Sequence, residues 1–445
     1  MASIFFNFQL PNPTTWFYFS ALLAVALFFK FSRLLSMRNL DVLTLYLFTP
    51  GLLLLAEGGT HDFFGYLWLM IASLYFLVRC LIDTALVRRP SLGTNLDLSG
   101  LAWLAGSLFV SLIAVACQQP AGDEKKEDAK GDPIGKSPKL IEKAIQPMAP
   151  PGVEDSRVYL WAERGLALLC HLSVVVALVL IGWRHFDDLR AGMSAATFYL
   201  LLPYTFLLLP DSPLGLGRWD HAWPMSLVLW SVFCYRRPVL SGMFLGVATG
   251  TAFFLLVALP AWLSFYRDRG ATRFLVSFVV SALMGLGVLG GLLWLNGELP
   301  SGLRSDWTTF DWQPWKHPAA TTPGFWRFAR MPAAYRVPVF FATMVLVIGS
   351  AFWPTPKNLA HLIALTAASL ISIQFWYADR GGVYILWFLP LLLLLVFRPN
   401  LSATAPPVPP SDDWIVGMGR RLRRLLRWRR PGPAPKVEPS GTLQS

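Results

Sequence analysis

The sequence is dominated by long apolar segments, which restrict the fold more than any other feature. Most approach the roughly 20 residues that a helix needs to cross the hydrocarbon core of a bilayer. They are apolar throughout, whereas the strands of an outer-membrane barrel alternate between apolar and polar residues. We therefore predict an all-α polytopic membrane protein with about 11–13 transmembrane segments. The segments fall at about 15–35, 41–56, 63–87, 99–117, 160–183, 191–210, 222–235, 239–266, 272–296, 335–353, 358–377 and 382–397.

The composition agrees with a chain surrounded by membrane lipids. Of the 445 residues, 55% are hydrophobic and 14% are charged, which is more apolar surface than one soluble domain can hide. The four cysteines (Cys80, Cys117, Cys170 and Cys234) lack the spacing of a metal or haem site, and we interpret them as small buried hydrophobic residues. We expect no cofactor, while dependence on a metal ion is left open.

Basic residues in the short loops predict the orientation, because lysine and arginine are retained on the cytoplasmic side. Residues 2–15 contain no lysine or arginine, whereas the loop after the first segment does. We expect a multi-pass protein of the inner (plasma) membrane, with its N-terminus outside and its C-terminus in the cytoplasm. The loops assigned to the cytoplasm carry Lys30, Arg33, Arg38, Arg88, Arg89, Arg184, Arg190, Arg236 and Arg237.

The segment 239–266 does not fit simple alternation. Arginines lie on both sides of it, so both flanks are expected in the cytoplasm. A hairpin of two half-length helices that bends near 249–254 satisfies the charge rule, although a single span remains the alternative. Gly242, Gly246 and Gly250 lie four residues apart, which permits close packing against another helix.

Changes in composition divide the chain into six parts. Residues 118–157 are rich in proline, glycine and mixed charge, which predicts a mobile extracytoplasmic loop. Arg420–Arg430 belong to an amphipathic pattern that suits an anionic inner leaflet, and no nucleic acid is expected to bind. The predicted parts are N-terminal helices (1–117), the polar loop (118–157), a transmembrane core (158–398), a Pro-rich linker (399–413), a basic amphipathic helix (414–430) and a disordered tail (431–445).

Several polar positions fall on the face predicted to lie outside. Asp220 and His221 form a carboxylate–imidazole pair that could deprotonate a hydroxyl, and Arg218 could neutralise a phosphate. The alternative for Asp220 is a helix N-cap. Trp312 and Trp315 could stack on sugar rings or simply anchor their loop at the lipid interface. The short sequence 379–382 (Asp-Arg-Gly-Gly) adds Arg380 as a second candidate phosphate ligand.

The region 160–398 resembles a known family of membrane enzymes. It is similar to the bacterial glycosyltransferases of GT-C architecture that use polyprenol-phosphate sugars, especially the mannosyltransferase-like family 87. The last motif of the resemblance along the chain is 384–390 (Tyr-Ile-Leu-Trp-Phe-Leu-Pro), which is similar to the family's closing helix. The others are 218–221 (Arg-Trp-Asp-His), 235–238 (Tyr-Arg-Arg-Pro), the glycine-spaced 240–250, 259–260 (Leu-Pro) and 264–267 (Ser-Phe-Tyr-Arg).

The resemblance implies an inverting transfer of a mannose-like sugar from a lipid-phosphate sugar donor to an extracytoplasmic acceptor. It also implies a catalytic acid in the first large outer loop, for which Asp155, or Glu154 beside it, is the nearest match, with Asp62 as another candidate. Two other functions remain open. The chain could be a non-catalytic membrane scaffold of the same fold, or a transporter or flippase.

Overall fold

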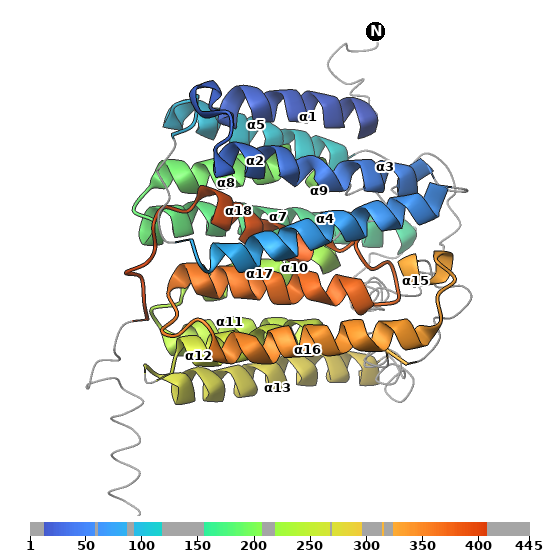
Figure 1. The fold of residues 1–445 in the computed structure, drawn as a ribbon, viewed down its shortest axis with the longest axis vertical. Helices are drawn as coiled ribbons and strands as arrows, with labels where there is room; N and C mark the ends of the chain where they lie inside the picture. Colours follow the sequence, from blue (N-terminus) through green and yellow to red (C-terminus); the bar gives the residue numbers. More distant parts are fainter. Residues whose placement is uncertain are drawn as a thin grey trace, which may run out of the picture. The chain divides into compact units, whose positions relative to one another are not determined.

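The structure, a computed structural model, describes residues 13–57, 61–86, 93–117, 155–206, 219–267, 269–295, 314–315 and 324–406. Within these ranges all regular elements are helices, which confirms the predicted all-α class (Figure 1). Short 3-10 turns lie between some of them, notably η5 (Phe253–Ala258) and η7 (Ile385–Trp387). The α-helices are α1 (Pro13–Phe28), α2 (Met37–Thr44), α3 (Phe48–Glu57), α4 (Asp62–Asp83), α5 (Leu98–Ala116), α7 (Asp155–His185), α8 (Leu189–Leu201), α9 (Pro203–Phe206), α10 (Trp219–Phe233), α11 (Pro238–Thr251), α12 (Leu259–Phe265), α13 (Ala271–Leu295), α15 (Phe325–Phe328), α16 (Arg336–Phe352), α17 (Leu359–Trp376) and α18 (Leu389–Phe397).

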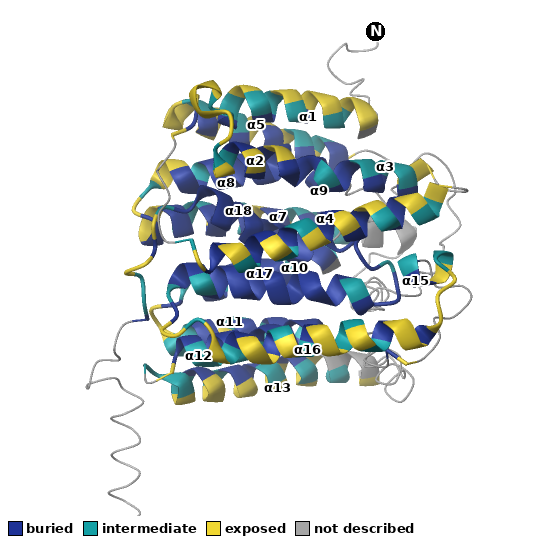
Figure 2. Ribbon diagram, viewed as in Figure 1, coloured by how far each residue is buried: buried dark blue, intermediate teal, exposed yellow. Residues whose placement is uncertain are grey.

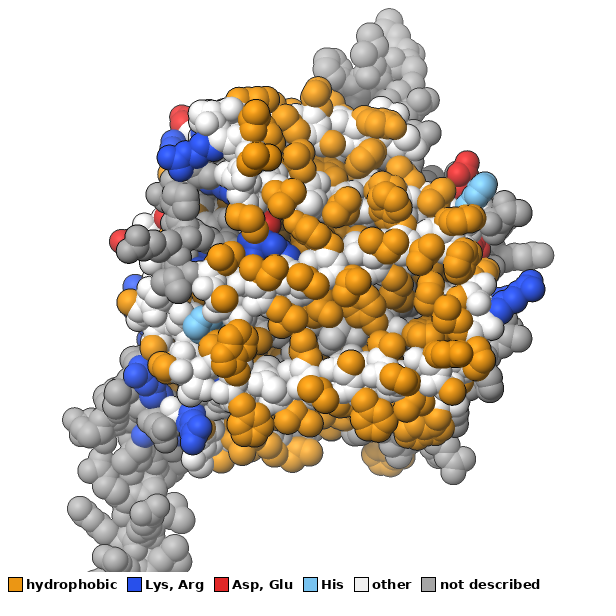
Figure 3. Space-filling model, in the orientation of Figure 1, with side chains coloured by type: hydrophobic (Ala, Val, Ile, Leu, Met, Phe, Trp, Pro, Cys, Tyr) orange, Lys and Arg blue, Asp and Glu red, His pale blue; other side chains and the backbone are white. Residues whose placement is uncertain are grey.

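The helices have the length and apolar surface of a multi-pass membrane protein. Among the described residues, seven helical stretches are long and apolar enough to cross a bilayer, and three shorter apolar helices accompany them. The long helices lie side by side across the view of Figure 1. Figure 3 shows their exposed side chains as a broad hydrophobic band, with charged groups near its two edges. Such a band is the surface that lipid tails would cover.

The bundle has two chemically different ends. One end, here called the basic end, carries the loops before α8, α11 and α13 and the loop between α16 and α17, and most of the Lys and Arg in Figure 3 lie at this edge, on the left. The other end, here called the opposite end, carries the starts of α4, α7, α10 and α16 and the end of α17. The described basic residues at the basic end include Lys30, Arg184, Arg190, Arg236, Arg237, Arg267, Arg269, Arg273, Lys357 and Arg398.

The segment 239–266 is a re-entrant hairpin, as the flanking arginines predict. Gly242, Gly246 and Gly250 of α11 lie directly against Phe274, Phe278 and Ala282 of α13, so these two helices run in parallel. The chain between them must therefore return to the end where α11 begins. A 2.7 Å hydrogen bond from the Tyr266 hydroxyl to the Tyr235 carbonyl oxygen joins the hairpin's two ends.

Burial is greatest in the middle of the bundle. Of the best spanning window in α17, 89% is buried, compared with 17% in α13 and 22% in α16. Figure 2 shows α17 and α18 as buried helices and α13 and α16 as helices with one exposed side. Elements α17 and α18 thus form the core, and α13 and α16 face the surroundings.

The last apolar segment is a shorter helix than the run 382–397 predicts. Element α18 begins only at Leu389 and has nine residues, which is about 14 Å of helix. Residues 377–384 form a largely buried connection that contains a turn at 377–382, and η7 joins this connection to α18. The ring of Trp387 in η7 stacks on Phe254 of η5 with 3.7 Å between ring centroids. Two interrupted helices therefore meet inside the bundle.

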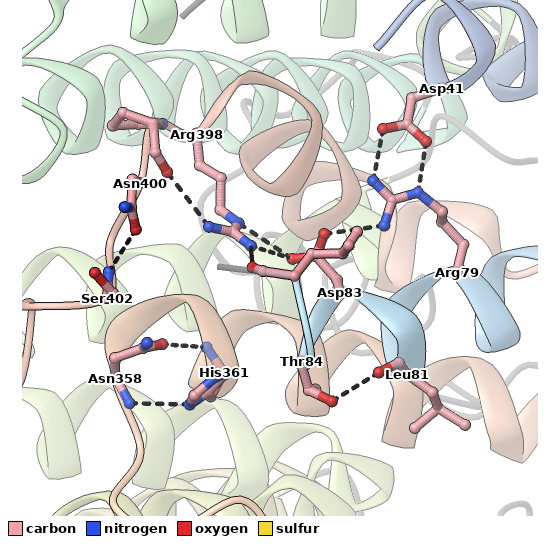
Figure 4. A network of polar contacts seen from close by, with 12 residues as sticks. Asp41, Arg79, Leu81, Asp83, Thr84, Asn358, His361, Arg398, Asn400 and Ser402 are labelled. Atoms are coloured by element: carbon pink, nitrogen blue, oxygen red, sulfur yellow. Dashed lines mark hydrogen bonds and ion pairs between the residues drawn. The ribbon is translucent and has the colours of Figure 1, made fainter. Parts of the chain in front are cut away.

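A network of buried charges joins α2, α4 and the end of α18 at the basic end. Arg79 donates two hydrogen bonds to the carboxylate of Asp41, at 2.7 and 2.8 Å, and one to Asp83 at 2.9 Å. Arg398 donates to the other oxygen of Asp83 at 2.7 Å. Figure 4 shows both guanidinium groups directed at Asp83 from different elements. The Arg79–Asp83 pair is the one that four-residue helical spacing predicts.

Candidate functional site at the opposite end

The turn after α17 has an unusual backbone. Arg380 has a φ of 47° and Gly382 a φ of 96°, both in the left-handed region. A residue with a Cβ pays roughly 1–2 kcal/mol for this conformation. Backbone of this kind persists only where the surroundings enforce it, and it is concentrated at functional sites. The turn 377–382 is therefore the first candidate for a site.

Neighbouring elements hold this turn in place. The Gly382 N–H donates to the side-chain oxygen of Gln374 at 2.8 Å. From α15, the Trp326 indole N–H donates to the Phe375 carbonyl at 2.9 Å. From α16, the Arg336 guanidinium donates to the Trp376 carbonyl, also at 2.9 Å. The last two bonds use backbone carbonyls at the end of α17 that have no partner within the helix.

Charged groups gather around the turn. Asp379 is buried, and Arg380 beside it is half-buried. The hydroxyl of Tyr66 on α4 lies within electrostatic range of Asp379 and Arg380, and also of Asp62 and Arg327. The opposite end thus brings charges from α4, α15 and the turn into one neighbourhood. Such convergence at the end of a helical bundle is expected of a site for a polar or phosphorylated molecule.

A column of aromatic rings leads from the turn into the bundle. The rings of His221 and Tyr384 stack with 5.4 Å between centroids, and those of Tyr384 and Trp387 with 4.2 Å. Phe254, at the tip of the hairpin, completes the column below Trp387. We call these four rings the aromatic column. It joins the start of α10, the turn and the tip of the hairpin.

Polar atoms beside the column are buried. Within the part of the chain that the structure describes, the indole N–H groups of Trp219 and Trp387 and the amide nitrogen of Gln374 have no hydrogen-bond partner. Buried donors are normally paired, and an unpaired donor costs free energy unless a ligand or water satisfies it. An acceptor atom of a ligand or of a water molecule beside these donors would remove that cost.

The structure places some of the predicted site residues here and not others. His221 is buried in the column, and Arg380 lies in the turn. Asp220 lies in the first turn of α10, so it is not the residue before the helix, and its side chain is outside the described residues. Trp315 is exposed. The predicted residues Glu154, Arg218 and Trp312 lie outside the described residues.

Asp155 is the first residue of α7, and its side chain is also outside the described residues. Helices α10 and α7 run in parallel, and a 2.7 Å hydrogen bond between Ser226 and Ser173 places these two residues at the same height along the bundle axis. Asp155 precedes Ser173 by many more residues than His221 precedes Ser226. At 1.5 Å per residue, Asp155 lies about 20 Å further out along the bundle than His221. Asp155 and His221 therefore lie at different heights along the bundle axis.

Several residues of this site are not singled out by the sequence. Asp379 is part of a short polar sequence but looks like an ordinary loop residue, and Tyr384 and Trp387 look like part of an apolar span. The available signal is the pair Gly381–Gly382 between two apolar runs, which marks a tight turn with left-handed backbone. The stacking partners lie more than a hundred residues away and leave no local pattern.

Other predicted features fall on parts that the structure does not describe. These are the loop 118–154, the helix 414–430 with Arg420–Arg430, the tail 431–445 and residues 407–413 of the linker 399–413. Among the described residues, no group of three or more His, Cys, Asp or Glu side chains could hold a metal ion. Comparison of the chain with protein-family models, curated proteins and solved structures finds no match.

Proposed function

We propose that the chain is an integral membrane glycosyltransferase that transfers a mannose-like sugar from a polyprenol-phosphate donor to an extracytoplasmic acceptor. The observation that supports this most is the turn 377–382, where Asp379 is buried and the adjacent Arg380 is held in left-handed backbone, close to the aromatic column. The turn lies at the end away from the basic loops, which is the extracytoplasmic end if positive charge sets the orientation. The sequence resemblance to family 87 supports the same activity.

The proposed chemistry needs one base and one cation. Asp379 takes the proton of the acceptor hydroxyl as the hydroxyl oxygen attacks the anomeric carbon of the sugar. The bond between that carbon and the phosphate oxygen breaks, and the polyprenyl phosphate leaves with its electron pair. Arg380 stabilises the charge on the departing phosphate. Attack from the face opposite the leaving group inverts the anomeric centre.

The remaining candidates have supporting roles in this proposal. Asp220 and His221, at the start of α10, help to bind donor or acceptor, and the rings of the aromatic column contact the sugar or the first isoprene units. Arg218 is a second phosphate ligand. Trp312 and Trp315 stack on sugar rings. Asp155 and Glu154 are the alternative bases that the family resemblance implies.

The test is transfer of radiolabelled sugar from polyprenol-phosphate donors into lipid or glycan by membranes that overproduce the chain. We expect Asp379→Asn to abolish transfer, because the amide cannot accept a proton. Glu57→Gln, which removes an exposed acid at the end of α3, at the same end of the bundle, serves as the matched control and should retain transfer. Asp155→Ala, Glu154→Ala and Asp220→Ala decide whether another acid is the base. Full transfer by Asp379→Asn at equal protein level would rule out Asp379 as the base.

Transport is a second candidate, because two interrupted helices meet inside the bundle. Broken helices at mid-depth are typical of substrate sites in secondary transporters, where exposed backbone lines the path. Here the tip of the hairpin and the end of η7 meet at Phe254 and Trp387. Reconstituted vesicles that move a lipid-linked sugar across the bilayer without hydrolysing or transferring it would favour this function.

A further inference from the structure

A groove opens at the basic end, far from the turn 377–382. It lies between α12, the start of α13 and the end of α16, and has a volume of about 640 Å³. Its apolar wall includes Leu259, Leu263 and Phe352, and its polar wall includes Ser264, Arg267 and Thr272. The groove is therefore amphipathic, with one wall suited to hydrocarbon and the other to a charged or hydroxylated group.

The polar wall is positively charged. Arg267 is exposed at the mouth of the groove, and Thr272 lies in the first turn of α13. Behind the wall, the buried ammonium of Lys357 donates to the Ser264 hydroxyl at 2.8 Å. In the sequence, Asp268 is the one acid between Arg267 and Arg273, while Arg269 and Arg273 add two further cations. The net charge around the groove therefore favours an anionic molecule.

The apolar wall is open to the surroundings of the bundle. Phe352 at the end of α16 is 73% exposed, and Val276, one turn into α13, is 58% exposed. Helices α13 and α16 are the least buried of the spanning helices. A lipid that lies along this edge would keep its acyl chains against exposed apolar side chains, while its headgroup reached the basic wall.

We propose that this groove is a binding site for an anionic glycerophospholipid of the leaflet at the basic end. The phosphate lies at Arg267 and Thr272, and the acyl chains run along α12, α16 and α13. This inference does not depend on the proposed glycosyltransferase activity. It concerns the basic end of the bundle, away from the candidate catalytic turn. The lipid also differs from the polyprenol donor.

The test measures binding of phosphatidylglycerol and phosphatidylcholine to the purified full-length chain in detergent by native mass spectrometry. Arg267→Gln removes a positive charge from the groove. Leu263→Trp places a larger side chain in the apolar part of the groove without changing its charge. Arg236→Gln removes an exposed arginine at the same end, away from the groove, and is the matched control. Size-exclusion profile and melting temperature verify that each variant is folded.

We expect Arg267→Gln to weaken phosphatidylglycerol binding about tenfold, which is the loss of one charged hydrogen bond. Leu263→Trp should weaken it to a similar degree, whereas Arg236→Gln should bind like the unaltered chain. Equal affinity of Arg267→Gln and the unaltered chain would overturn the site. Equal affinity for phosphatidylcholine and phosphatidylglycerol would also overturn it, because the groove would then not distinguish an anionic headgroup from a zwitterionic one. Competition by millimolar inorganic phosphate alone would show an anion site without a lipid.

Discussion

Asp83 is the residue on which the buried charges of the basic end depend. It accepts from Arg79 on its own helix and from Arg398 at the end of α18. Both of its oxygens are used, and its side chain is fully buried. Asp83→Ala would leave two buried guanidinium groups short of a partner. We expect it to lower the free energy of unfolding by about 3–5 kcal/mol, measured as a fall in melting temperature of the protein in detergent.

Asp97→Ala is the control, because it removes an exposed acid at the same end of the bundle. Asp97 caps α5, so we expect this variant to lose about 1 kcal/mol, well below the loss in Asp83→Ala. The pair is also tested by Asp83→Leu combined with Arg398→Met. Replacing both charges with apolar groups is expected to restore much of the stability that Asp83→Ala loses, since no unpaired charge remains buried. A double variant as unstable as the single one would show that the pair itself stabilises the fold.

Lys357 predicts a pH dependence. It lies between α16 and α17, and burial lowers the pKa of its ammonium from 10.5 to about 8. The folded chain therefore releases this proton at lower pH than the unfolded chain. Stability from this group rises with pH between about 8 and 10.5, and it is lowest below 8, where folding must bury the charge. Lys357→Met should raise the melting temperature more at pH 7 than at pH 10. A difference that is independent of pH would contradict this pKa.

At the scale of single residues, sequence anticipates only local partners. The four-residue spacing of Arg79 and Asp83 indicates their pairing, and a histidine within an apolar helix indicates a bond to a neighbour. The expectation for the histidine is confirmed, since the ring of His171 on α7 and the hydroxyl of Tyr199 on α8 are 2.7 Å apart. Arg398, by contrast, lies 315 residues from Asp83. No local sequence pattern predicts that Arg398 pairs with Asp83, because only tertiary packing brings the two residues together.

Among the elements, the hairpin α11–α12 depends on close contact with α13. A Cβ on Gly246 would lie 2.4 Å from the Phe278 carbonyl oxygen, so any side chain forces the backbones apart. We expect Gly246→Leu to destabilise the fold by about 1–3 kcal/mol or more. Gly287→Leu on α13 is the matched control, because a Cβ at Gly287 meets nothing within 4 Å. Equal melting temperatures of the two variants would contradict the packing of α11 on α13.

The sequence anticipates this hairpin because charge and glycine spacing both report on it. Arginines on both flanks favour a hairpin over a single crossing, and the spacing of the three glycines indicates the packing face. The start of α18 is less predictable. Residues 382–397 form a continuous apolar run, and periodicity alone cannot distinguish a helix from a buried turn that leads into one. The contacts of the aromatic column, which come from α10 and η5, decide that the helix begins at Leu389.

For the whole molecule, hydropathy predicts the class well because a bilayer demands long apolar helices whatever their packing. The alternation of basic loops also predicts which helix ends lie together, and the described helices obey it. It does not predict the functional site, whose parts come from α4, α10, the hairpin and the turn after α17. The central claim at this scale is that the basic end faces the cytoplasm and the candidate site faces the other side of the membrane.

Two natural cysteines report on this claim. The interpretation of all four cysteines as buried is wrong for these two, which lie just beyond the ends of their helices. Cys117 is exposed and follows α5 at the opposite end, whereas Cys234 is partly exposed and follows α10 at the basic end. Cys80 and Cys170 are buried and should stay silent. A membrane-impermeant maleimide added to intact cells should label Cys117, with the signal lost in Cys117→Ser, and should label Cys234 only after the membranes are opened. Labelling of Cys234 in intact cells while Cys117 is protected would invert the orientation and place the candidate site in the cytoplasm.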